Sequence, residues 1–124
     1  KTGGISSYSS SKAALNMLTR ALAAELHGTG ISVNTVAPVN SVITENVQKM
    51  IDTGQLSIER LQAPEDPEVM AEAILALCEV DPDVSTGLIT YSGQYLQKIG
   101  REVRGRDGGA FDAKITTESV KYDA

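Results

Sequence analysis

Tyr8 and Lys12 are the two residues whose types and spacing could do chemistry. They stand four positions apart at the start of a predicted helix, so both side chains lie on one face. A free phenol has a pKa near about 10, and a nearby ammonium group lowers it by favouring the phenolate. Such a tyrosine can give a proton to a carbonyl oxygen or take one from an alcohol. The spacing alone fits an accidental pair on an exposed turn equally well.

The elements around this pair predict an α/β fold. Apolar residues recur at helical spacing over residues 8–27, and Gly28 and Gly30 follow where a helix would end. These apolar residues cover more than one stripe, which predicts a helix buried on two sides. The β-branched residues 31–36 predict a buried strand that stops at Pro38. A helix joined to a strand by a tight turn is typical of α/β proteins.

The rest of the chain continues this alternation. We expect a short helix within residues 43–51, broken at Thr53 and Gly54, and a second helix starting at Asp66 and Pro67. Residues 88–91 predict a second strand. Two strands of parallel character cannot bury both faces of a sheet by themselves, so the sequence predicts missing strands on the N-terminal side of Lys1.

Composition narrows the function classes. The formal charge of −5 argues against a nucleic-acid partner, because phosphate binding needs a basic face. The single cysteine, Cys78, leaves no intrachain disulfide or cysteine-cluster metal site, fits a reducing compartment, and is expected in the core of its helix. No apolar run is long enough for a membrane span, and no secretory signal opens the chain. We therefore expect a cytoplasmic protein with no membrane partner and no metal.

Four separated blocks of sequence agree with one known family. In chain order they are Tyr8-Ser9-Ser10-Ser11-Lys12, Ile31-Ser32-Val33-Asn34-Thr35-Val36-Ala37-Pro38, Pro64-Glu65-Asp66 and Ser85-Thr86-Gly87-Leu88. In this order and spacing, residues 1–96 resemble the short-chain dehydrogenase/reductase family from its active-site tyrosine helix to its last strand. The resemblance implies the C-terminal part of a Rossmann-like doubly wound parallel sheet, a three-layer αβα fold, without its N-terminal half. Residues 97–124 are interpreted as a polar C-terminal tail, solvated or partly disordered.

The resemblance also implies an activity, the interconversion of a secondary alcohol and a ketone with NAD or NADP. Tyr8 would be the general acid/base, and Lys12 would lower its pKa and bind the ribose hydroxyls of the cofactor. The segment after the strand would pass the nicotinamide. The cofactor-binding residues carried over in this way are Tyr8, Lys12, Pro38, Val39, Val42 and Thr44. The family resemblance further implies a homodimer or homotetramer.

The sequence departs from the family pattern both in the segment after the strand and in parts of the pattern that are absent. Val39 stands where the family usually has glycine, and Thr44 comes one position later than in the commonest pattern. The catalytic serine of the family lies 13 positions before its tyrosine, whereas seven residues precede Tyr8 here. The glycine-rich phosphate loop and the residue that selects NAD or NADP are also missing, so the cofactor preference stays open. A non-catalytic relative, serving in oligomerisation or binding, is the alternative reading.

Overall fold

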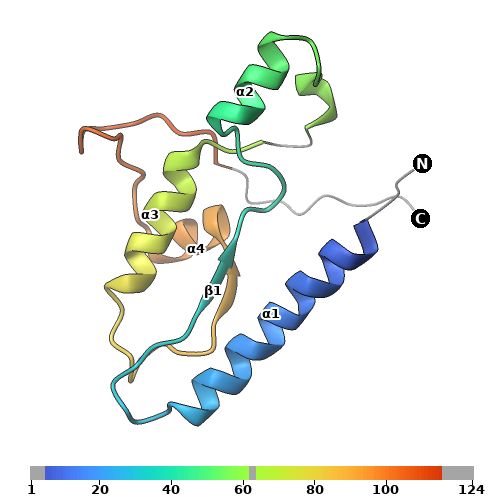
Figure 1. The fold of residues 1–124 in the computed structure, drawn as a ribbon. Coiled ribbons are helices and arrows are strands. Elements are labelled where there is room, and N and C mark those ends of the chain that lie inside the picture. Colours follow the sequence, from blue (N-terminus) through green and yellow to red (C-terminus); the bar gives the residue numbers. More distant parts are fainter. Residues whose placement is uncertain (1–4, 62–63, 116–124) are drawn as a thin grey trace. The chain divides into compact units, whose positions relative to one another are not determined.

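The computed structural model describes residues 5–61 and 64–115, which form an alternation of helices and short strands (Figure 1). In chain order the elements are α1 (Ile5–Glu25), β1 (Thr35–Ala37), α2 (Glu45–Asp52), the 3₁₀ helix η1 (Ile58–Arg60), α3 (Pro67–Cys78), β2 (Ile89–Tyr91) and α4 (Ser92–Ile99). The predicted helices α1, α2 and α3 are confirmed, as is the helix start at Pro67. Helix α4 falls where the sequence predicted no element.

The described residues divide into two compact units. The first combines residues 5–35 with residues 79–89, and the second combines residues 36–61, 64–78 and 90–115. The division passes through both strands. Tyr8 and Lys12 therefore belong to the first unit, and Pro38 to Thr44 belong to the second.

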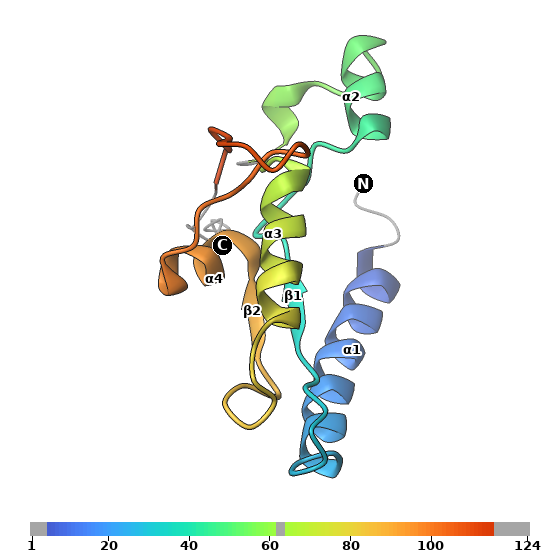
Figure 2. The same ribbon diagram turned by 90° about the vertical axis from the view of Figure 1, so that its left-hand side faces the viewer.

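Strands β1 and β2 pair side by side in a two-stranded sheet (Figure 2). Gly87 N donates to Val33 O at 2.7 Å and Thr35 N donates to Leu88 O at 2.8 Å, so the partners advance in the same direction and the pairing is parallel. The predicted α/β class with parallel strands is thus confirmed.

The first strand is shorter than predicted because side chains replace part of its ladder. Residues 31–34 lie outside β1. Val33 N donates to Thr86 Oγ1 at 3.1 Å, and Asn34 Oδ1 accepts from Leu88 N at 2.9 Å. Val33 N and Leu88 N thus bond to a hydroxyl and an amide side chain in place of backbone partners, which interrupts the regular strand pairing at this point.

Helix α1 is buried along one narrow stripe rather than on two sides. Thr19 and Ala23 are its buried residues among those described, whereas Leu15, Met17 and Leu18 are exposed. The prediction of two-sided burial is therefore wrong for this chain. The described sheet has two strands, which offer too little apolar surface to cover a helix of 21 residues.

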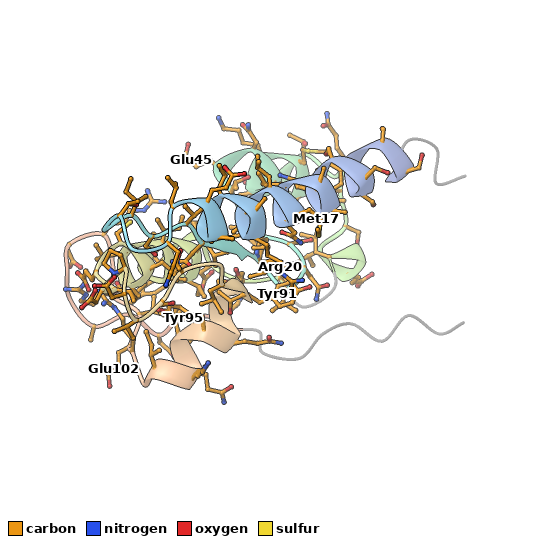
Figure 3. All side chains as sticks on the ribbon, turned by 90° about the horizontal axis from the view of Figure 1, so that it is seen from below. Met17, Arg20, Glu45, Tyr91, Tyr95 and Glu102 are labelled. Atoms are coloured by element: carbon orange, nitrogen blue, oxygen red, sulfur yellow. The ribbon has the colours of Figure 1, made fainter. Side chains whose placement is uncertain are left out.

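Helices α3 and α4 form the core of the second unit. Val69 and Ala73 on α3 and Tyr95 and Leu96 on α4 are buried, and the two helices pack together. Tyr95 lies on α4 and Tyr91 at the end of β2 (Figure 3). Tyr91 is 44% exposed. These contacts, rather than the short strands, supply most of the buried apolar side chains of this unit.

The prediction that Cys78 belongs to the core is wrong, because Cys78 is exposed. The buried residues of α3 are Val69, Glu72, Ala73 and Ala76, which recur at the three- and four-residue spacing of one helix face. Cys78 follows Ala76 by two positions, and residues two apart lie on different faces of a helix.

Residues 101–104 are held against the rest of the second unit, whereas their composition predicted a solvated tail. Val103 is buried, and Arg104 forms an antiparallel bridge with Ala110. Arg101 Nε lies 2.7 Å and Arg104 Nη2 lies 3.0 Å from Glu72 Oε1, so two arginines fasten this segment to α3. The division into a domain of residues 1–96 and a tail of residues 97–124 stays a prediction, and residues 116–124 lie outside the described part.

Glu72 gives the stability of the protein a defined pH dependence. Hydrogen bonds from Arg104 hold the pKa of Glu72 below its ordinary value of 4.5, against the opposing effect of burial, and Arg101 adds to the lowering. A lowered pKa means that the unfolded state binds the proton more readily. The stabilisation is therefore complete above about pH 4.5 and is lost as pH falls through the folded-state pKa.

We expect Glu72→Gln to lower the free energy of unfolding at neutral pH by about 1–2 kcal/mol, because charge-assisted hydrogen bonds to two partly exposed arginines are lost. The variant should also show a smaller loss of stability between neutral and acid pH. Urea unfolding at a series of pH values measures both effects. Glu102→Gln, at an exposed position of the same unit, is the matched control. Equal acid dependence in the two variants would contradict the role given to Glu72.

Candidate active site

The Tyr8–Lys12 pair lies in the first turns of α1. Lys12 Nζ is 5.5 Å from the centroid of the Tyr8 ring, so the two side chains share one face, as the spacing predicted. Ser11 Oγ donates to Tyr8 O at 2.7 Å within the same turn. Tyr8 is 64% exposed, and its hydroxyl group hydrogen-bonds to none of the described residues. The phenol and the ammonium are therefore adjacent and open to a ligand.

The segment after β1 is held by a second, isolated parallel bridge between Val42 and Glu65. Glu65 N donates to Ser41 O at 2.9 Å, and Ile43 N donates to Glu65 O at 3.1 Å. In a parallel ladder, the residue between two such bonded neighbours points its own N–H and C=O groups to the opposite edge. The backbone groups of Val42 thus face away from Glu65, on the edge that a ligand could use.

Thr44 closes this segment and starts the next helix. Its side chain caps α2 by accepting from Val47 N at 3.4 Å, and its own N–H donates to Val42 O at 2.9 Å. A threonine hydroxyl group can accept and donate at once. Thr44 is exposed and donates its hydroxyl hydrogen to none of the described residues, so this hydrogen is available to a ligand.

Pro38 and Val39, the other two residues predicted to bind the cofactor, directly follow β1 and are half-buried. The structure thus brings Tyr8 and Lys12 together in the first unit. It also places Pro38, Val39, Val42 and Thr44 within one short segment of the second unit. The convergence of the two sets on one ligand stays a prediction.

Two buried polar residues beside this segment, Glu65 and Ser92, were not predicted as part of the site. Glu65 stands in one of the family-like sequence blocks without a predicted role of its own, and it is buried with its Oε1 accepting from Ser92 Oγ at 2.6 Å. Burial raises the pKa of Glu65 above its ordinary value of 4.5, and the hydrogen bond from Ser92 lowers it by less. No local pattern signals a contact between residues 27 positions apart.

Two kinds of site were not found in the described part of the chain. Residues 5–61 and 64–115 contain no group of three or more His, Cys, Asp or Glu side chains placed to hold a metal ion. Among the helices of those residues, none combines the length and apolar character that crossing a membrane requires.

Known proteins resemble this chain in sequence and in fold. Residues 1–54 match the family model of the short chain dehydrogenases. The 7alpha-hydroxysteroid dehydrogenases of Escherichia coli strains K12 and O157:H7 are each 37% identical over 108 residues, covering 80% of this chain and 40% of the relative. A crystal structure of a protein from Xanthomonas campestris, assigned as a dehydrogenase, has a TM-score of 0.51 at 24% identity and covers 78% of this chain and 33% of that one.

The chain belongs to the short-chain dehydrogenase family, as the four sequence blocks predicted. The solved structure supports the fold alone, and the α/β arrangement with two parallel strands is consistent with part of a Rossmann-like fold. The chain spans about 40% of the length of the curated relatives it matches.

Proposed function

We propose that the protein is an NAD- or NADP-dependent oxidoreductase that interconverts a secondary alcohol and a ketone, with Tyr8 as its general acid/base. The observation that carries the proposal is the Tyr8–Lys12 pair, which shares one face at the exposed start of α1 in a chain of the short-chain dehydrogenase family. In the reductive direction Tyr8 gives a proton to the carbonyl oxygen, and in the oxidative direction it takes one from the alcohol.

The nicotinamide cofactor, when bound, supplies the hydride to the carbonyl carbon or accepts it from the alcohol carbon. Lys12 has a cationic head beside Tyr8 that can donate to ribose hydroxyl groups as well as favour the phenolate. The donors and acceptors of the 38–44 segment fit a carboxamide, which needs both. Val42 has an N–H group without a partner among the described residues, and its carbonyl oxygen, which accepts from Thr44 N, keeps a second lone pair. Thr44 has a hydroxyl hydrogen available. Pro38 and Val39 would line the same nicotinamide by contact.

The substrate class is supported by the relatives. The two Escherichia coli proteins are named for a hydroxysteroid, whose 7α-hydroxyl group is a secondary alcohol. A secondary alcohol or its ketone is therefore the substrate class we propose for this protein, and the steroid skeleton is one member to test first.

The proposal is tested with the protein produced from its full natural reading frame. Purified protein is incubated with NADH or NADPH and a panel of ketones, including 7-ketosteroids, and the loss of reduced cofactor is followed by absorbance. Turnover with one of the two cofactors is expected. Cofactor binding without turnover of any ketone or alcohol would instead favour a non-catalytic relative, and absence of binding would refute the proposal.

We also propose that the active protein is a homodimer or homotetramer. The cytoplasmic location stays a prediction. Support comes from the exposed Leu15, Met17 and Leu18 on α1, because clustered apolar side chains on a surface are typical of an interface. Light scattering of the full-length protein at micromolar concentration should give two or four times the monomer mass. A monomer that is active at this concentration would contradict the proposal.

A further inference from the structure

The side chain of Glu65 is buried, although water would solvate its carboxyl group better. Glu65 is 1% exposed, and Ser92, the first residue of α4, is fully buried beside it. Burial of a carboxyl group costs free energy unless hydrogen bonds compensate. Glu65 Oε1 accepts a hydrogen bond from Ser92 Oγ at 2.6 Å, whereas Glu65 Oε2 has no hydrogen-bond partner among the described residues. A buried polar group of this kind calls for a role that an apolar residue would not fill.

The backbone of the same residue holds the candidate cofactor segment. The carbonyl oxygen of Glu65 accepts a hydrogen bond from Ile43 N, and the N–H of Glu65 donates to Ser41 O. These two bonds turn the peptide groups of Val42 to the opposite edge. Asn40, two residues before Val42, has a buried Nδ2 without a partner among the described residues. The orientation of Val42 therefore depends on where Glu65 is held, and Ser92 holds Glu65 from the side of α4.

We propose that Glu65 is a positioning residue for cofactor binding: its carboxyl group, anchored by Ser92, fixes the segment from Ser41 to Thr44 so that the peptide groups of Val42 and the hydroxyl group of Thr44 meet the nicotinamide carboxamide. The inference rests on the proposed function and deepens it. Glu65 itself touches neither substrate nor cofactor, and it acts through the parallel bridge.

The test measures the cofactor dissociation constant of the full-length protein by fluorescence titration with NADH and NADPH. Glu65→Ala removes the acceptor of the Ser92 hydrogen bond, and we expect the constant to rise roughly tenfold, about the net value of one hydrogen bond. Glu65→Gln keeps an oxygen for Ser92 and should bind nearly as tightly as the wild type. Ser92→Ala should weaken binding as Glu65→Ala does, and the double variant should be no worse than either single variant.

A further readout separates positioning from general stability. Glu65→Ala should speed the hydrogen exchange of the Ile43 amide, which donates to Glu65 O, and should raise the cofactor KM more than it lowers kcat. Glu102→Ala, an exposed acid of the same unit, is the control expected to change neither quantity. A folded Glu65→Ala protein with unchanged cofactor affinity overturns the inference even if its melting temperature falls.

Failure of the proposed function would look different. In that case the wild-type protein itself binds neither cofactor, and no variant needs to be compared by affinity. The exchange of Ile43 then decides the structural half of the inference. Faster exchange in Glu65→Ala supports the anchoring of the segment, and unchanged exchange overturns it.

Discussion

Replacement of Tyr8 by phenylalanine is expected to lower kcat of the full-length protein by about 10²–10⁴-fold while leaving the cofactor dissociation constant nearly unchanged. Phenylalanine keeps the ring beside Lys12 Nζ but cannot give or take a proton, and general acid–base catalysis typically contributes a factor of this size. Tyr8 is largely exposed in the first turns of α1, so removal of one hydroxyl group should leave the fold intact. Steady-state kinetics on a confirmed ketone, with a parallel cofactor titration, measure both constants.

Tyr91→Phe is the matched control, because it deletes the same hydroxyl group from another exposed tyrosine, at the end of β2. Its kcat should stay within about twofold of the wild type, as for a surface substitution without a catalytic role. If Tyr8→Phe and Tyr91→Phe turned over ketone equally fast, Tyr8 would not be the acid/base. The split between kcat and affinity also separates this variant from those at Glu65, which are expected to change affinity first.

Local sequence signals were sufficient to predict the ends of helices where glycine or proline sets the backbone conformation. Helix α3 begins at Pro67, where the pyrrolidine ring fits the first turn and the missing N–H has no partner to lose. Helix α2 ends at Asp52 with Thr53 as its C-cap, and Gly54 follows with a φ of +71°, a conformation that glycine adopts without strain. The long first helix followed from apolar residues at helical spacing, and the first strand from a run of β-branched residues.

Contacts between residues far apart in the sequence could not be predicted from these local signals. The burial of Glu65 depends on Ser92, 27 positions away, and the attachment of residues 101–104 depends on Glu72, although their composition predicted a solvated tail. Helix α4 was missed because its first residues, Ser92 and Gly93, are poor helix formers, and its stability comes from packing on α3. Of the candidate site, the shared face of Tyr8 and Lys12 was predicted, whereas the bridge that orients Val42 was not.

Within the first unit, helix α1 lies close to the segment before β2. Gly87 has a φ of +76°, and a Cβ atom added there would lie 3.3 Å from Ala23 Cβ. Gly87→Ala should therefore lower the free energy of unfolding by about 2–3 kcal/mol, the sum of a left-handed backbone cost of about 1–2 kcal/mol and the displacement of packed neighbours. Urea unfolding of the full-length protein measures the change.

Gly28→Ala separates the two causes, because Gly28 has nearly the same φ, +77°, and nothing within 4 Å of the added atom. It should cost the backbone share alone, about 1–2 kcal/mol. Shortening the facing side chain gives a further check. In an Ala23→Gly background, which itself costs about 1 kcal/mol in a helix, Gly87→Ala should also cost the backbone share alone. If Gly87→Ala were as mild as Gly28→Ala in the wild-type background, α1 would not pack on Gly87 as closely as the structure shows.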